Sequence, residues 1–162
     1  LFRDCAAGNI SSTAFYSNLL NHWGGEAGGR LQGNGWERLG KKANFRELAQ
    51  SYIKIIEAPS AERDDVVVDQ LDHLATNKNP ARKAFLSEML CLEFPNLFPV
   101  LNKPVQSYLS KINFKGASGM SEGARYLDLA IKLRISLAQN PKHPARNIAE
   151  LDTVFWLEAN PM

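Results

Sequence analysis

The side chains that could perform acid–base or nucleophilic chemistry are few and far apart in this sequence. The three histidines are His22, His73 and His143, and the two cysteines are Cys5 and Cys91. A nucleophile needs a base held against it, and a structural zinc ion needs Cys or His ligands at short spacings. Neither cysteine lies in a CxxC pair or near a histidine at ligand spacing. We therefore expect no enzyme active site, no metal site, no cofactor and two reduced thiols.

A run of acidic residues offers the next candidate for chemistry. Its members alternate with apolar residues in one helical stretch: Glu62, Asp64, Asp65, Asp69 and Asp72. Clustered carboxylates can bind a metal ion, but acidic side chains near a helix start are also favoured by the helix dipole. We interpret the run as a solvated helix face, and His73 within it as exposed or partly buried and not a ligand.

The segment 24–40 holds seven of the eleven glycines, which argues against regular structure there. A phosphate-binding Walker loop needs GxxxxGK[ST], but Gly40 and Lys41 are followed by a second lysine, Lys42, where that motif has Ser or Thr. We expect a surface loop. Trp36 either anchors this loop on the core or is exposed for a partner.

Positive charge is concentrated in the second half of the chain. Residues 1–77 hold eight Lys and Arg against ten Asp and Glu, net −2, whereas residues 78–146 hold eleven against four, net +7. A basic surface of this kind can meet nucleic-acid phosphates, although it can also be a set of solvated helix faces. The candidates for phosphate contact are Lys103, Lys111, Lys115 and Arg125 around the predicted loop 113–120, and Lys132, Arg134, Lys142 and Arg146 beyond it.

Helical periodicity and capping residues predict the elements of the first half. Ser11 or Ser12 can cap a helix that buries Phe15 and Leu19, and Asn44 with Glu47 can cap a second helix that runs to about Glu57. The apolar stripe of the second comprises Phe45, Leu48, Ala49, Tyr52, Ile53 and Ile56. A third helix follows Pro59 and Ser60, and its apolar residues are Val66, Val67, Leu71 and Leu74. Residues 1–10 have no clear pattern.

The densest apolar run, residues 85–109, organises the second half. We expect a helix with Phe85, Met89 and Leu92 as its core stripe, and then an extended crossing at residues 94–103 that carries Phe94 and Phe98 into the core. Pro104 then opens a short helix that buries Val105, Tyr108, Leu109 and, at its end, Ile112. Two more helices follow: one from Ser121 to about Gln139, with Ala124, Leu127, Ala130, Ile131, Leu133 and Leu137 buried, and one capped by Asn147 and Glu150.

Two stretches of this half resemble a helical accessory or N-terminal region of McrB-type restriction ATPases and related prokaryotic defence proteins. They are LSEMLCLEFPNLFPVLNKPVQSYL and AELDTVFWL, and the match covers residues 85–157. The residues that carry it are Leu86, Leu90, Pro95, Phe98, Pro99, Asn102, Leu109, Glu150, Leu151, Asp152, Phe155 and Trp156. The Walker motifs of that family's motor are absent, so the resemblance implies an accessory or recognition module.

Together these features predict an all-α protein, a single compact helical domain of about seven helices with a Gly-rich loop. We expect a peripheral helix and loop over residues 1–40 and a helical core over 41–162, within a longer protein. No apolar run is long enough to cross a membrane, so we expect a cytoplasmic protein. Its expected role is to bind DNA or to position an ATPase or nuclease subunit. The alternative is a protein–protein interaction or assembly domain without nucleic-acid contact.

Overall fold

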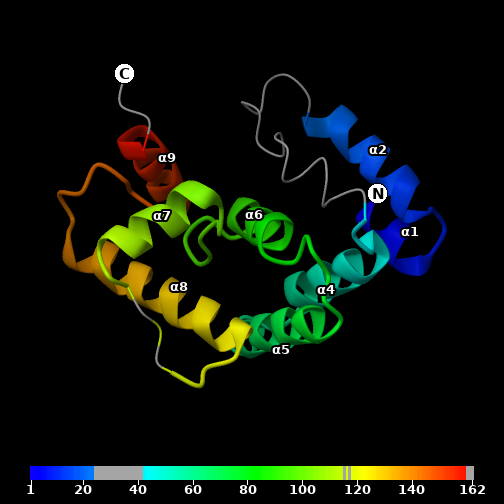
Figure 1. Cartoon of the computed structure of the whole chain (residues 1–162), viewed down its shortest axis with the longest axis horizontal. Coiled ribbons are helices and arrows are strands. Elements are labelled where there is room, and N and C mark those ends of the chain that lie inside the picture. The colour runs from blue at the N-terminus through cyan, green and yellow to red at the C-terminus, as the bar shows by residue number, and fades with distance from the viewer. Residues whose placement is uncertain (24–41, 115, 117, 160–162) are drawn as a thin grey trace. The chain divides into compact units, whose positions relative to one another are not determined.

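A computed structural model describes residues 1–23, 42–114, 116 and 118–159, and every regular element in them is a helix. Trp36 and Lys115, two of the predicted contact residues, lie outside the described part of the chain. The all-α prediction is confirmed (Figure 1). The chain divides into two compact units, Leu1–Phe85 and Leu86–Met162, and each is described by itself. The boundary expected near residue 40 stays a prediction.

The first unit contains α1 (Phe2–Ala7), α2 (Ser12–Trp23), α4 (Phe45–Glu57), α5 (Arg63–Thr76) and the first residues of α6 (Ala84–Glu93). Aromatic rings from four of these helices form its core. The Phe15 ring lies 5.0 Å from Phe2 and 5.2 Å from Phe45, and the Phe45 ring lies 5.5 Å from Phe85. Phe15, Phe45 and Phe85 are fully buried, so the core of this unit is held by rings from distant parts of the sequence.

Side-chain caps set the starts of the helices as expected. The Ser11 hydroxyl accepts a hydrogen bond from the Ala14 amide at 3.1 Å, and the Asn44 side chain accepts one from Glu47 at 3.2 Å. The Ser12 hydroxyl accepts from the Phe45 amide at 3.1 Å, which ties α2 to the start of α4. These bonds satisfy amides that have no partner within their own helix.

Helix α1 was not expected from the sequence. It has six residues and one buried side chain, Cys5, so no apolar period can develop over its length. Gly8 ends the helix with a φ of 83°, a left-handed conformation that glycine adopts without a steric cost. Tertiary packing stabilises this short helix, since the Phe2 ring lies 4.7 Å from Tyr52 as well as against Phe15.

The prediction for α6 is right for Phe85 and Met89 and wrong for Leu92. Residues 85–91 are all buried, whereas Leu92 is 49% exposed. Leu92 lies seven residues after Phe85 on the same helix face, about 10.5 Å further along the axis. Because seven consecutive residues are buried, α6 is covered on every side as far as Cys91, and the cover ends before its last two residues, Leu92 and Glu93.

The segment between α6 and α7 (Lys103–Lys111) begins as a tight turn and only then becomes extended. The Phe98 amide donates to the Phe94 carbonyl at 3.2 Å, and residues 98–102 have no regular structure. Phe98 is fully buried as predicted, but Phe94 is half-buried because it stands at the start of the turn. The crossing is held from two sides: the Leu101 amide donates to Ser87 Oγ at 2.8 Å, and the Tyr126 hydroxyl to the Pro99 carbonyl at 2.7 Å.

The second unit completes its core with α7, α8 (Glu122–Gln139) and α9 (Ile148–Ala159). The rings of Tyr108 and Phe155 stack at 4.1 Å between α7 and α9. Two burial predictions are wrong here, because Ile112 is 53% exposed beyond the end of α7 and Ile131 is 39% exposed on α8. The buried face of α8 is centred instead on Tyr126, Leu129 and Ala130.

The two stretches that carry the family resemblance meet in this unit. The Asn102 side chain donates to Asp152 Oδ1 at 2.7 Å and accepts from the Val105 amide at 3.1 Å, so Asp152 holds the residue that caps α7. The Ala149 amide also donates to the Pro95 carbonyl at 3.1 Å. The start of α9, capped by Asn147 as predicted, is therefore bound to the crossing. No described helix is long and apolar enough to cross a membrane.

Candidate nucleic-acid interface

Two of the predicted cations lie on one exposed edge of α8. Arg125 and Lys132 are both exposed and are seven residues apart, which places them two turns apart on the same helix face. The helix that carries them begins at Ser121, whose hydroxyl accepts from the Ala124 amide at 3.1 Å as the sequence predicts. We call Arg125 and Lys132 the cationic edge.

The loop from α7 to α8 passes along the cationic edge. An ideal Cβ at Gly116 would lie 2.8 Å from Arg125 Cγ, so only glycine allows the loop to approach this closely without a shift of the arginine. Arg125 Nη2 donates to the Met120 carbonyl at 3.2 Å. Lys132 Nζ lies 4.9 Å from the centre of the Phe114 ring, which supports the ammonium group through a cation–π contact.

Lys111 stands where this loop begins. It is the last residue of α7 and is exposed, and three residues later the chain reaches Phe114 under Lys132. A lysine in the last turn of a helix is favoured by the partial negative charge of the helix C-terminus. Lys111 therefore precedes the loop that follows the cationic edge, and it is the third exposed cation of this region.

The structure separates the remaining candidates from that edge. Arg134 lies nine residues after Arg125, on the opposite side of α8, and is half-buried. Its Nε donates to the Leu97 carbonyl at 2.8 Å, and its guanidinium carbon lies 5.1 Å from the Phe98 ring, so it serves the core contact with the crossing. Lys103 is exposed at the other end of α7 from Lys111. Arg125 and Lys132 therefore share one face of α8, and Lys111 stands at the start of the loop that passes it. That these residues contact phosphate stays a prediction.

Three exposed cations beside a small-residue loop can bind phosphate oxygens, because they supply positive charge and hydrogen-bond donors. They do not form a shape that would select one base. One of the three charges is partly offset, since Lys132 Nζ pairs with Asp128 Oδ2 at 2.7 Å. Such an exposed pair is worth little in water and can exchange for another anion. The chemistry available here is ionic recognition.

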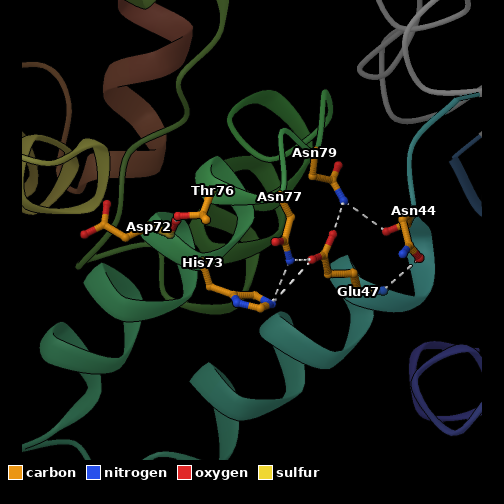
Figure 2. A network of polar contacts seen from close by, with 7 residues as sticks. All are labelled: Asn44, Glu47, Asp72, His73, Thr76, Asn77 and Asn79. Carbon is orange, nitrogen blue, oxygen red and sulfur yellow. Dashed lines mark hydrogen bonds and ion pairs between the residues drawn. The ribbon is translucent and has the colours of Figure 1, made fainter.

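A second polar cluster, in the first unit, has no signal in the sequence. Figure 2 shows His73 and Asn77 of the α5 end pointing toward the Glu47 carboxylate on α4. Asn79 Nδ2 donates to Glu47 Oε2 at 3.0 Å and to the Asn44 carbonyl at 3.1 Å, and Asn77 Nδ2 donates to Glu47 Oε1. These partners lie about 30 residues from Glu47 in the chain, so no local pattern connects them.

The geometry of this cluster indicates a structural link. Asn79 is 3% exposed, and its side-chain oxygen accepts from the Ala81 amide at 3.2 Å, so every polar atom of its amide is used. The His73 Nε2 atom lies 3.4 Å from Glu47 Oε1 and 3.3 Å from Asn77 Nδ2, with half of its side chain in solvent. The link joins the start of α4 to the end of α5 and satisfies groups that would otherwise be buried without partners.

Three further described side chains with reactive potential are His143, Cys5 and Tyr126. His143 Nδ1 accepts from the Ala145 amide at 3.0 Å and closes the turn before α9. Burial raises the pKa of the Cys5 thiol, and burial, aided by Cys91, raises the pKa of Tyr126 well above 10.0. Among the described residues no three His, Cys, Asp or Glu side chains are grouped to hold a metal ion.

No protein-family model, curated protein or solved structure matches this chain. Its function therefore has to be argued from its own residues.

Proposed function

We propose that this chain is a non-catalytic recognition module of a prokaryotic restriction or phage-defence system, and that Lys111 and the cationic edge bind DNA phosphates. The observation that carries the binding proposal is the position of Arg125 and Lys132, two turns apart on one exposed helix face and bordered by the loop at Gly116. Their separation of about 10.5 Å along α8 lets each meet a different phosphate of a strand.

The defence-system context is supported by the residues that resemble McrB-type proteins. Asn102 and Asp152 come from the two separate stretches of that resemblance and are hydrogen-bonded at 2.7 Å, so the stretches act as parts of one structural unit. In this context the module places an ATPase or nuclease subunit on the DNA that it binds. The partner subunit supplies the chemistry, and among the described residues of this chain no three His, Cys, Asp or Glu side chains are grouped to hold a catalytic metal ion.

The test is a salt titration of binding to a labelled 20-bp duplex and to a single strand of the same length, followed by fluorescence anisotropy from about 50 to about 200 mM salt. The triple variant Lys111→Gln/Arg125→Gln/Lys132→Gln should lose most of the binding. Each lost phosphate contact should lower the slope of log K against log salt by roughly 0.9 on duplex DNA. The measured change in slope counts the contacts directly.

Two control variants make this test specific. Lys42→Gln/Lys54→Gln removes exposed charge from the first unit and should leave the slope nearly unchanged. Arg134→Gln should lower stability, because it removes the bond to the Leu97 carbonyl, while leaving the slope unchanged. Absence of binding by the wild-type chain at about 50 mM salt contradicts the proposal, and so does an equal loss in the Lys42→Gln/Lys54→Gln control.

A protein–protein assembly role is the second candidate, and one observation favours it. Ile131 and Ile135 are 39% and 50% exposed, and they lie one turn apart on the outer side of α8. Neighbouring apolar side chains on one helix face are typical of interaction surfaces, whereas single exposed ones are ordinary.

A further inference from the structure

The outer side of α8 carries two exposed apolar side chains next to two exposed cations. Ile131 and Ile135 form an apolar pair, and Lys132 and Arg125 border that pair on one side. Helical geometry places the pair opposite the buried Tyr126 and Ala130, so it is the most outward part of the helix. A partner for this surface needs acidic groups set beside an apolar contact, and one of them must replace Asp128, which pairs with Lys132 at 2.7 Å within the same helix.

The chain itself has a helix face of that kind on α5. Glu62, Asp65 and Asp69 are exposed and recur at intervals of three and four residues along one line, which we call the acidic ridge. The half-buried Val66 lies next to this ridge. Glu62 and Asp69 are seven residues apart, as Arg125 and Lys132 are, so both charged lines have a spacing of two helical turns, about 10.5 Å.

We propose that a second copy of the chain docks its acidic ridge on the cationic edge of α8, so that Ile131 and Ile135 lie against the region of Val66. Charge complementarity supports the pairing at the level of the whole chain, since residues 1–77 carry net −2 and residues 78–146 carry net +7. Electrostatic complementarity of this kind fixes the partner and register more than it adds affinity.

The contact joins two different surfaces, so it is heterologous. After pairing, one copy keeps an unused edge and the other keeps an unused ridge, so association can continue in a head-to-tail manner unless the rotation closes a ring. Because exposed ion pairs are weak and screened by salt, association should be concentration-dependent and should weaken as salt rises from about 50 to about 500 mM.

Self-association does not depend on DNA binding, but the two proposed contacts use the same residues of α8. DNA phosphates and a second copy would both occupy Arg125 and Lys132, so adding duplex should lower the mass of the assembled protein if both proposals hold. If the chain binds no DNA, the duplex should leave the mass unchanged, while self-association persists. The two proposals can therefore fail separately.

The test is the weight-average mass of the full chain, measured by sedimentation from micromolar to near-millimolar concentration. The wild type should rise above the monomer mass at low salt and return to it at high salt. Arg125→Glu/Lys132→Glu should repel the ridge, and Asp65→Lys/Asp69→Lys should repel the edge, so each variant alone should remain monomeric. An equimolar mixture of the two should associate again, because each now complements the other.

The matched control is Lys42→Glu/Lys54→Glu, which makes the same change in net charge as Arg125→Glu/Lys132→Glu at two exposed lysines that belong to neither surface, and it should associate as the wild type does. Ile135→Ser tests the apolar part and should reduce association without altering its salt dependence. Far-UV circular dichroism verifies that each variant is folded. A wild type that stays monomeric, a control that dissociates like the edge variant, or a mixture that fails to associate would each overturn the proposal.

Discussion

Replacing Asn102 tests whether its side chain caps α7 and whether its hydrogen bond to Asp152 holds that cap in place. In Asn102→Ala the Val105 amide loses its acceptor at 3.1 Å, which for an N-cap typically costs about 1 kcal/mol of unfolding free energy. The bond from Asn102 Nδ2 to Asp152 Oδ1 at 2.7 Å is also lost, and a bond to a charged group contributes about 1.5–3 kcal/mol when well shielded. Both side chains are half-buried, so solvent screening reduces the second contribution to about 1 kcal/mol, and we expect a total loss of about 2 kcal/mol.

Urea denaturation followed by circular dichroism at the helix band measures this loss, and a double-mutant cycle separates its two parts. Asn102→Ser keeps a capping oxygen but cannot reach Asp152, so it should lose less than Asn102→Ala. The cycle of Asn102→Ala with Asp152→Ala should give a coupling of about 1 kcal/mol. A coupling below about 0.5 kcal/mol would falsify the idea that Asp152 acts through Asn102.

Two further predictions concern groups whose pKa is raised by burial. The Tyr126 hydroxyl is fully buried and stays protonated in the folded state above its ordinary pKa of 10.0, so the folded chain binds more protons than the unfolded chain at alkaline pH. The protonated hydroxyl therefore contributes its full stabilisation below pH 10.0, and the free energy of unfolding falls as the pH rises above that value. In urea titrations at about pH 8 and about pH 11, Tyr126→Phe should show a smaller fall in this free energy than the wild type. Cys5 and Cys91 are 0% and 1% exposed, and burial raises the pKa of Cys5, so a thiol reagent should modify both only after denaturation; rapid reaction of the native chain would contradict this.

Local chemistry in the sequence was enough to locate most helix starts. Asn44 with Glu47, Ser121 with Ala124, and Asn147 with Glu150 are all capping contacts within three residues, and such contacts depend on neither the rest of the fold nor its packing. Helix α1 was not predicted, because six residues are too few to show a helical period of apolar residues. The aromatic contacts that stabilise it come from Phe15, Tyr52 and Phe85, which are distant in the sequence.

Burial was predicted less well, for a physical reason that Leu92 and Ile131 illustrate. Periodicity predicts which side chains share a helix face. How far along the helix that face is buried depends on the length and position of the elements that pack against it. Phe85 is covered by aromatic rings and Leu92, two turns away, is not. On α8 the buried face is centred on Tyr126, a residue whose hydroxyl needs a buried acceptor that only the fold supplies.

The candidate site was predictable in part from spacing alone. Arg125 and Lys132 fall on one face because they are seven residues apart, and the same rule places Arg134 on the opposite face. A count of net charge treats all three cations as equivalent, whereas their spacing along the helix separates Arg134 from the other two. The cluster around Glu47 had no such signal, because Asn77 and Asn79 reach it only through the packing of α4 on α5.

The crossing between α6 and α7 determines which residues of α8 face outward. Two contacts fix the rotation of α8 about its own axis: Tyr126 donates to the Pro99 carbonyl at 2.7 Å, and Arg134 donates to the Leu97 carbonyl at 2.8 Å. They are eight residues apart, about 12 Å along the helix, so α8 cannot roll without breaking both. With Tyr126 held inward, Arg125 and Lys132 project from the side and Ile131 and Ile135 from the outer surface. The proline-rich segment that carries the resemblance thus has a second effect, because it sets the direction of the surface on which both binding proposals depend.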